Sequence, residues 1–185
     1  SPAPRVVNMI HLGRALAEVG RMLTGTLDID EAGGRVVSAV LGLFKARRSA
    51  LFELESASGS LVCVAVAGER DPVNWVGQRF GPGEGVVGRA VAESRPVWTS
   101  DLLGDPRIVV PPWVRERARE AGYAGVAAVP LTIQGEVIGA LSISDAYKRV
   151  FTDDEVGLLS AFGDQAALAL QNARLLSESN RRRHE

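Results

Sequence analysis

The sequence predicts an α+β fold in which a central, mostly antiparallel sheet is flanked by helices, with the N- and C-terminal helices packed together on one face. Three observations predict this fold. The expected elements follow the order helix, helix, strands, short helices, hairpin, helix, which favours helices packed on an antiparallel sheet. The best strand signals pair as hairpins across short turns. Long amphipathic helices open and close the sequence.

Composition limits the possible functions. The 185 residues are 46% hydrophobic and 23% charged, which is ordinary for one globular domain with a hydrophobic core. A net charge of −1 gives no electrostatic reason to expect binding to nucleic acid or to a membrane. The single cysteine, Cys63, excludes an internal disulfide and fits a reducing compartment. Because no apolar run reaches the roughly 18 residues that span a bilayer, we expect a cytoplasmic protein.

The first half of the sequence predicts two helices and a hairpin. Apolar residues recur at spacings of three and four within 6–24, and a second helix is expected over 28–44, capped by its first residue. Residues 48–55 alternate in polarity, which is typical of a half-buried strand. A turn at 56–59 then leads into a returning strand, 61–67, that is rich in valine.

A polar stretch, 68–78, leads into a more irregular part of the sequence. Short elements and a second hairpin are predicted there. In chain order they are a helix over 86–93, a strand over 97–99, an irregular loop over 100–112, a helix over 113–121 ended by Gly122, and strands 126–132 and 137–144 around a Gln134-Gly135 turn.

The last helix has a complete entry signal and two apolar rows. Thr152 and Glu155 are spaced for a reciprocal capping box. Phe151 is expected to pack on Val156 as a hydrophobic staple. The first apolar row is Leu159, Phe162, Ala166, Ala169, Ala173 and Leu176, and the second is Leu158, Ala161, Leu168 and Leu175, interrupted by Gln165 and Asn172.

One apolar row is enough for a helix to pack on its own domain. The second row therefore predicts contact with another helix. We expect a parallel homodimer formed by the first and last helices, because an uncovered row would expose a large apolar patch. Two-fold pairing would bring both C-termini out on the same side. The candidate interface residues are Leu12, Leu16, Val19, Leu23, Leu168 and Leu175.

Three features that suggest chemistry have simpler explanations. Gly83–Gly88 matches the spacing of a dinucleotide-binding loop, but the neighbouring strand signals are hairpins rather than parallel strands. A tight turn into a short helix, packed closely at Gly88, is favoured instead. Cys63 lies between valines in a strand, so we expect it to be buried and unreactive. His11 and His184 lie on terminal helices, so neither metal, haem nor another cofactor is expected.

The segment 97–125 is the best candidate for a binding region. It places Trp98, Trp113 and Tyr123 in loops and short helices of a chain with only 5% aromatic residues. Loops and short helices on a rigid sheet often carry binding sites. The segment is therefore predicted to line a pocket, although part of it could also be satellite core.

Several motifs occur in a characteristic order. They are Gly83-x-Gly85-x-x-Gly88-x-Ala90, Pro96-Val97-x-x-x-Asp101, Asp105-Pro-Arg107, Val129-Pro130-Leu131, Gly135, Val137-Ile-Gly139-x-Leu141, Phe151-x-x-Asp154-Glu155 and Asn172-Ala173-Arg174-Leu175. Over residues 8–178 this combination resembles a GAF domain. The resemblance implies a small-molecule-sensing module of bacterial signalling proteins such as histidine kinases, with terminal helices that dimerise and pass the signal on.

The resemblance also implies a pocket between the sheet and the segment 97–125. Its candidate ligand-binding residues are Trp98, Asp101, Arg107, Trp113, Tyr123, Val129 and Ser142. We expect an N-terminal tail over 1–7, one sensor domain over 8–178, and over 179–185 the start of a linker helix to a covalently linked output domain.

Departures from the family's specialised branches leave the ligand unidentified. Tyr147-Lys148 stands where cyclic-nucleotide-binding members carry Asn-Lys. Haem- and bilin-binding members need a histidine in the domain, and the methionine-sulfoxide-reductase branch relies on several cysteines. Three hypotheses follow: a non-enzymatic small-molecule sensor, a ligandless dimerisation and relay domain with a filled pocket, and an enzyme of the methionine-sulfoxide-reductase type.

Overall fold

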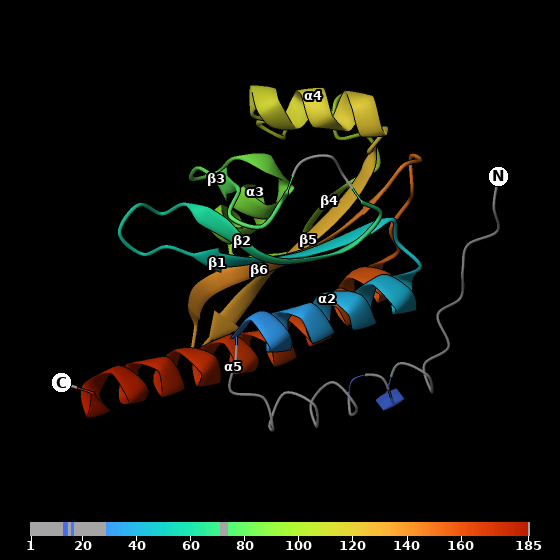
Figure 1. Cartoon of the computed structure of the whole chain (residues 1–185). Coiled ribbons are helices and arrows are strands. Elements are labelled where there is room, and N and C mark those ends of the chain that lie inside the picture. The colour runs from blue at the N-terminus through green and yellow to red at the C-terminus, as the bar shows by residue number, and fades with distance from the viewer. Residues whose placement is uncertain (1–12, 15, 17–28, 71–73, 185) are drawn as a thin grey trace.

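The computed structural model describes residues 13–14, 16, 29–70 and 74–184 (Figure 1). The predicted tail and most of the predicted first helix lie outside the described residues, and so do the candidate interface residues Leu12, Val19 and Leu23.

A single six-stranded sheet forms the centre of the domain. Its strand order is β3-β2-β1-β6-β5-β4, and every neighbouring pair is antiparallel. The strands are β1 (Arg48–Leu54), β2 (Leu61–Gly68), β3 (Arg79–Phe80), β4 (Val97–Thr99), β5 (Gly125–Ile133) and β6 (Glu136–Asp145).

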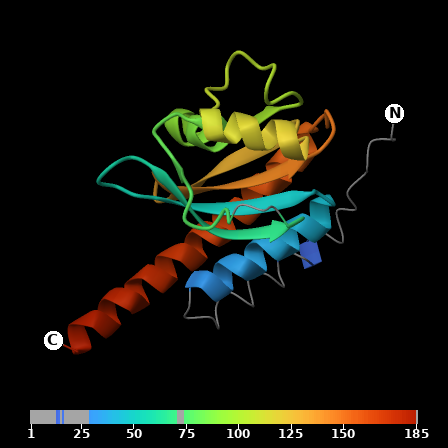
Figure 2. The ribbon, with the colours of Figure 1, turned by 45° about the horizontal axis from the view of Figure 1, so that its top comes forward.

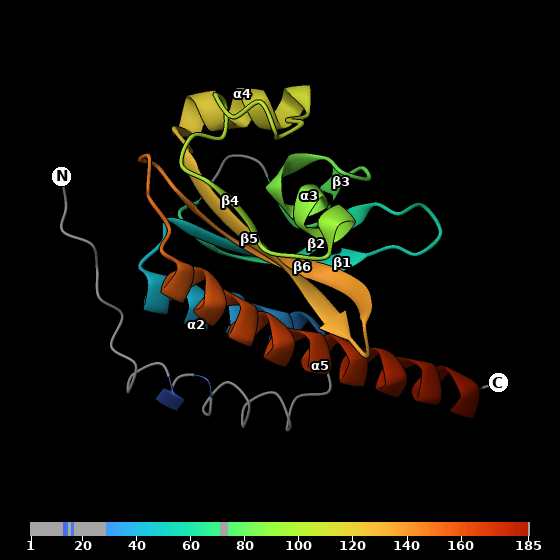
Figure 3. The same ribbon diagram turned by 180° about the vertical axis from the view of Figure 1, so that it is seen from behind.

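Helices cover both faces of the sheet. The long helices α2 (Ile29–Phe44) and α5 (Asp153–Arg183) lie side by side on one face. The short helices α3 (Gly85–Glu93) and α4 (Pro112–Ala121) lie over the other (Figures 1 and 3). The α+β prediction is therefore confirmed, with the antiparallel sheet between two helical layers.

The sheet separates two hydrophobic cores, because successive side chains of a strand point to opposite faces. We call the cluster under α2 and α5 the helix-side core; it includes Val37, Phe44, Leu51, Val129, Leu141, Ile143, Leu159 and Phe162. We call the cluster under α3 and α4 the cavity-side core; it includes Ala50, Phe52, Cys63, Phe80, Val86, Val114, Tyr123, Val126 and Ala128.

The entry to α5 forms as the sequence predicts. The Thr152 hydroxyl accepts a hydrogen bond from the backbone N–H of Glu155 at 3.1 Å, and the backbone N–H of Thr152 donates to the Glu155 carboxylate at 3.2 Å. Phe151 and Val156 are both buried in the helix-side core. Local residue chemistry therefore fixes where this helix begins.

One sequence expectation for the strands was wrong, and one strand was not predicted. Residues 48–55 were expected to be half-buried, but β1 is buried on both faces from Arg48 to Phe52, because α3 and α4 cover its second face. The two-residue strand β3 was not predicted, since two residues carry no detectable periodicity.

The second apolar row of α5 is uncovered in the single chain only in its later part, because Leu158 packs partly against the helix-side core. Leu168 and Leu175 are 51% and 58% exposed, whereas the first row is buried as far as Ala173. The second half of α5 extends beyond the sheet (Figure 2). Leu16 packs in part against the helix-side core of its own chain. None of the described helices combines the length and the apolar composition that are needed to cross a membrane.

Candidate functional site

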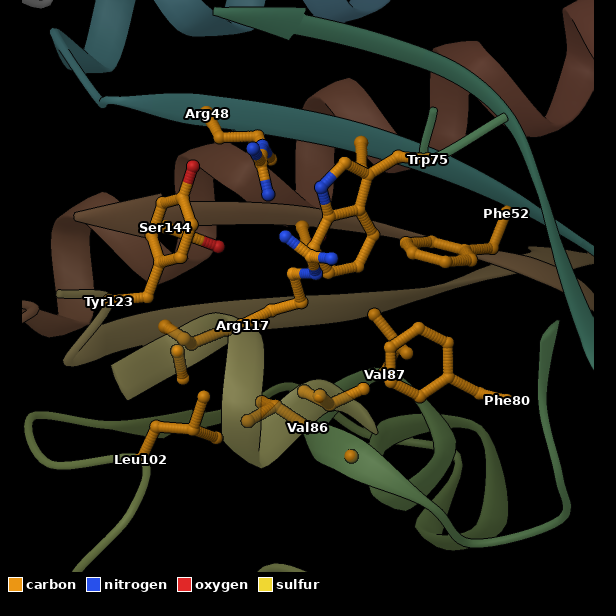
Figure 4. Close-up of a pocket in the computed structure, with 16 residues that line it drawn as sticks. Arg48, Phe52, Trp75, Phe80, Val86, Val87, Leu102, Arg117, Tyr123 and Ser144 are labelled. Atoms are coloured by element: carbon orange, nitrogen blue, oxygen red, sulfur yellow. The ribbon is translucent and has the colours of Figure 1, made fainter. Parts of the chain in front are cut away.

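A cavity of about 70 Å³ lies between the sheet and the layer formed by α3 and α4 (Figure 4). Side chains of β1, β5 and β6 form its floor. Side chains of α3, α4 and the loop that carries Leu102 form its roof, and Trp75 and Phe80 close one side. The cavity thus lies on the sheet face opposite the two long helices.

Strand register explains which floor residues meet. On β1, the alternation turns Arg48, Ala50 and Phe52 toward the cavity. Arg48 stands opposite Ser144 on β6, and Ala50 stands opposite Ser142. The chain therefore brings a cation and two hydroxyl side chains together from strands that are nearly 100 residues apart in sequence.

Arg48 is the most unusual group in the cavity, because its side chain is charged yet the residue is only 5% exposed. Its guanidinium carbon lies 4.5 Å from the ring centre of Trp75 and 4.5 Å from that of Tyr123. Cation–π contacts of this kind contribute about 2 kcal/mol or more when they are shielded from water. The two rings hold the buried charge in the cavity wall.

Tyr123 is fixed in place from several directions. Arg47 lies 5.0 Å from its ring centre and donates hydrogen bonds to Glu69 and to the carbonyl of Ala121 at the end of α4. On the other side, the backbone N–H of Leu102 donates to the carbonyl of Ala124 at 2.9 Å. The tyrosine therefore lies at the corner where the end of α4 leads into β5.

The opposite end of the cavity is aromatic and aliphatic. Phe52 and Phe80 meet edge to face with 5.5 Å between ring centres. Trp113 lies 5.5 Å from both Phe80 and Trp75, so it supports the wall from behind. This end offers apolar surface without charged side chains among the described lining residues.

The glycine motif serves this wall rather than a nucleotide. Gly85 has a φ of +69°, and a Cβ at this position would lie 2.8 Å from the Phe80 ring. A Cβ on Gly88 would lie 2.9 Å from the carbonyl carbon of Gly83. Glycine is needed at both positions for close packing at the start of α3. The antiparallel sheet excludes the doubly wound fold of dinucleotide-binding loops.

A second cavity, of about 200 Å³, adjoins the first and shares Arg48, Arg117 and Tyr123 with it. Its other lining residues are Arg47, Glu69, Arg70, Glu120 and Ala121. Among the lining residues, arginines outnumber glutamates by four to two. The polar end of the first cavity therefore continues into a basic outer space.

The structure brings some of the sequence-predicted site residues together. Tyr123 and Ser142 line the cavity, and Trp113 packs behind its aromatic wall. Trp98 is 36% exposed and is paired in register with Ala127 of the helix-side core, so it lies on the other side of the sheet.

Asp101, Arg107 and Val129 also lie outside the cavity lining. Asp101 pairs with Lys148 at 3.4 Å. Arg107 pairs with Asp105 at 2.7 Å and donates to the carbonyl of Trp98 at 3.0 Å. Val129 belongs to the helix-side core, because it stands one position out of phase with Val126 and Ala128. The structure thus removes it from the candidate site.

Arg48 and Arg117, the two charged residues among those described that line the first cavity, were not predicted from the sequence. A signal for Arg48 existed, since it lies on the same strand face as the apolar residues Ala50 and Phe52. Arg117 carried a weaker signal: it lies three positions after Val114 and one before Ala118, the two buried residues of α4, and therefore shares their face.

Cys63 is buried in the cavity-side core, as expected. Burial raises the pKa of its thiol to about 11, so at neutral pH almost all of it is in the unreactive protonated form. Within the described part of the chain, no cluster of three His, Cys, Asp or Glu side chains is suited to hold a metal ion.

Comparisons with known proteins agree with this architecture. The structure of the GAF domain from a phosphoenolpyruvate-protein phosphotransferase of Coxiella burnetii matches with a TM-score of 0.79 at 22% identity, covering 92% of this chain and 99% of that chain. Free methionine-R-sulfoxide reductase from Neisseria meningitidis matches with a TM-score of 0.73 at 17% identity, covering 89% of this chain and 90% of that chain. A methyl-accepting chemotaxis protein, residues 122 to 287, matches with a TM-score of 0.71 at 21% identity, covering 85% of this chain and 98% of that chain.

At these identities the solved structures establish a shared fold. The family itself follows from a sequence model described as GAF domain, which matches residues 26–171. This match spans most of the chain and includes the sheet, the cavity and the first half of α5. The chain belongs to the GAF domain family.

Proposed function

We propose that this domain senses a small molecule in the cavity between the sheet and α4, and passes the binding event to α5 as part of a signal-transduction protein. The observation that carries the proposal is the buried charge of Arg48 in the wall of an otherwise mostly apolar cavity. Ligand sites typically combine apolar walls with a few placed polar groups. Structural relatives from a chemotaxis protein and a phosphotransferase support a signalling role.

The size of the cavity limits how a ligand enters. Its 70 Å³ is below the roughly 300 Å³ of typical small-molecule sites. Arg117 lines both cavities, and its side chain is 28% exposed. In the proposed mechanism, a ligand displaces the Arg117 side chain toward solvent and uses part of the outer cavity.

A hydrogen-bonded junction connects the cavity to α5. Beside Tyr123, the backbone N–H of Ala124 donates to the carbonyl of Asp145 at 2.9 Å, and that of Gly125 donates to the carbonyl of Tyr147 at 3.1 Å. Asp145 in turn shares Arg149 with Glu155 in the first turn of α5. A ligand that favours one position of Tyr123 would bias this junction, which is what a signal requires.

The small cavity favours a second candidate, a ligandless dimerisation and relay domain. In that case the interior side chains themselves fill the space under α4, and only the helix surfaces matter. Leu168 and Leu175 would serve dimerisation in either case.

We propose no enzymatic activity for this domain. One structural relative is a free methionine-R-sulfoxide reductase, but thiol chemistry needs a thiolate, and burial keeps Cys63 protonated. Any catalytic output, such as a kinase, would reside in a linked domain of the full-length protein.

A fragment screen by NMR separates sensing from ligandless relay. The sensing proposal expects small fragments to shift the indole N–H signal of Trp75 and the amide signals of α4. Val126→Phe, which adds a ring inside the cavity, should abolish these shifts while the protein stays folded. If no fragment shifts these signals, the sensing proposal fails and the relay proposal remains.

A further inference from the structure

We propose that the cavity binds a small uncharged molecule with an apolar body the size of a single ring and one hydrogen-bonding group, and that the Ser142 hydroxyl is the partner of that group. This inference rests on the proposed sensing function and adds the chemical class of the ligand. It follows from which polar groups of the cavity have partners within the protein and which one does not.

Ser142 is a buried polar residue in the floor of the cavity. It lines the cavity and is only 6% exposed. In the part of the chain that the structure describes, its hydroxyl has no hydrogen-bond partner. Buried hydroxyl groups are normally paired, either within the protein or with a bound molecule. Ser142 therefore offers one donor and one acceptor to a molecule that occupies the cavity.

The side chains beside Ser142 are short and apolar. In the sheet register it stands opposite Ala50 of β1 on one side and Ala128 of β5 on the other. Two residues along β1 from Ala50, the Phe52 ring meets Phe80 at the aromatic end of the cavity (Figure 4). A ligand whose polar group reaches Ser142 therefore places its apolar body against these rings.

The charged groups of the cavity do not call for an anionic ligand, because they have partners within the protein. Arg48 lies 4.5 Å from the ring centres of both Trp75 and Tyr123, and Arg117 pairs with Glu120 at 3.3 Å. Each of the two arginines also makes a further interaction. A charged ligand would have to compete with these partners and leave its own hydration shell, whereas an uncharged ligand does neither.

The small volumes favour a ligand of one ring or a short branched chain. The inner cavity measures about 70 Å³ and adjoins the outer one of about 200 Å³. An engineered apolar cavity of about 150 Å³ binds benzene, so the inner cavity with the adjoining part of the outer one is large enough for one ring. Phenol and toluene are suitable probes, because they have nearly the same shape and only phenol carries a hydroxyl group. Benzoate tests whether the site instead prefers a charged ligand.

The test measures the affinities of these three probes by calorimetry and by the Trp75 indole N–H signal. We expect phenol to bind at least about 3-fold more tightly than toluene, because only phenol forms the hydrogen bond to Ser142. Benzoate should bind at least about 10-fold more weakly than phenol, because its charge is buried without a free partner. Ser142→Ala should lower the affinity for phenol to that for toluene and leave toluene unchanged.

Ser49→Ala is the matched control. Ser49 precedes Ala50 on β1 and faces the helix-side core, opposite Ile143. Its hydroxyl is also buried and has no hydrogen-bond partner among the described residues. The same substitution at Ser49 should leave the affinities for phenol and toluene unchanged. Far-UV circular dichroism checks that both variants are folded, as the alanines beside Ser142 lead us to expect.

The outcomes separate the inference from the function on which it rests. If toluene binds as tightly as phenol, or if Ser142→Ala keeps the preference for phenol, the assignment of Ser142 is overturned and sensing stands. If benzoate binds more tightly than phenol, the uncharged class is overturned and sensing stands as well. If none of the three probes binds, the inference is also overturned, and the fragment screen then decides whether sensing fails with it.

Discussion

Arg48 and Arg149 are both almost completely buried, but their surroundings give them different roles. Arg48 lies between aromatic rings in the cavity wall. Arg149 donates to Asp145 and to Glu155, both at 2.7 Å, and lies 5.2 Å from the Phe151 ring centre. Burial opposes the charged form of Arg149, but hydrogen bonds to the two carboxylates raise its pKa. It therefore stays charged and ties the end of β6 to the start of α5.

Replacing Arg149 by Met should be strongly destabilising. The change leaves two buried carboxylates without their shared cation, and breaking a buried ion pair from one side costs about 3–5 kcal/mol. Urea denaturation measures the loss in the free energy of unfolding. Arg35→Met is the control, because Arg35 belongs to an exposed i,i+4 pair with Glu31 that contributes about 0.5 kcal/mol or less. Equal losses in the two variants would contradict the structural role of Arg149.

Asp105 should make the loop before α4 sensitive to acid. The Arg107 guanidinium beside it holds the pKa of this carboxyl well below its usual range. A carboxyl pKa that is lower in the folded state stabilises the fold above the unfolded value of about 3.9 and loses this effect as the pH falls toward the folded value.

The Asp105→Asn variant tests this pH dependence. Relative to the parent, it should be less stable by about 0.5–1 kcal/mol at pH 7, a small effect because Arg107 is half exposed. The difference should shrink by pH 3. A difference of equal size at both pH values would show that the charge of Asp105 does not contribute.

Elements defined by neighbouring residues could be predicted from the sequence. The turn between β5 and β6 has Gln134 at a φ of +51° and Gly135 at +81°, which matches the hairpin expected for this pair. The capping box at Thr152 and the end of α4 at Gly122 are also found at the predicted positions. These features depend on contacts within a few residues.

The composition of the cavity could not be predicted, because it depends on contacts between distant segments. Arg48 lines the cavity only because β1 pairs with β6 in a register that sets it opposite Ser144. Val129 was predicted to line the pocket, but it points to the helix-side face of the sheet. A shift of one residue along a strand moves a side chain to the opposite face. Trp98 was predicted to line the pocket because it is aromatic, but it lies on the other side of the sheet.

The whole domain has one face for a candidate ligand and another for a candidate partner. Residues of α3 and α4 line the cavity, and the two long helices lie on the opposite face of the sheet (Figure 1). The six-stranded sheet stands between them, so any signal from the cavity must go through or around the sheet. In the proposed mechanism, the junction at Tyr123, Asp145 and Glu155 is this route.

The exposed row on α5 should pair two copies of the domain. We expect the parent to sediment as a dimer at tens of micromolar, and Leu168→Glu combined with Leu175→Glu to give a folded monomer. The control is Ser177→Glu with Asn180→Glu, which adds the same charge to other exposed positions of α5 and should leave the dimer intact. A monomeric parent would contradict the proposed interface.

Hydrogen exchange of α5 tests the central proposal most directly, because it asks whether the cavity and the output helix are coupled. Amide exchange is measured with and without a saturating concentration of a fragment that binds the cavity in the NMR screen. The account predicts altered protection around Tyr123 and also in the first turns of α5, from Glu155 to Leu159. Arg149→Lys, which keeps the charge but disturbs the paired hydrogen bonds, should reduce the change in α5 more than that at Tyr123. Changes confined to α4 and the cavity lining would contradict signalling through α5.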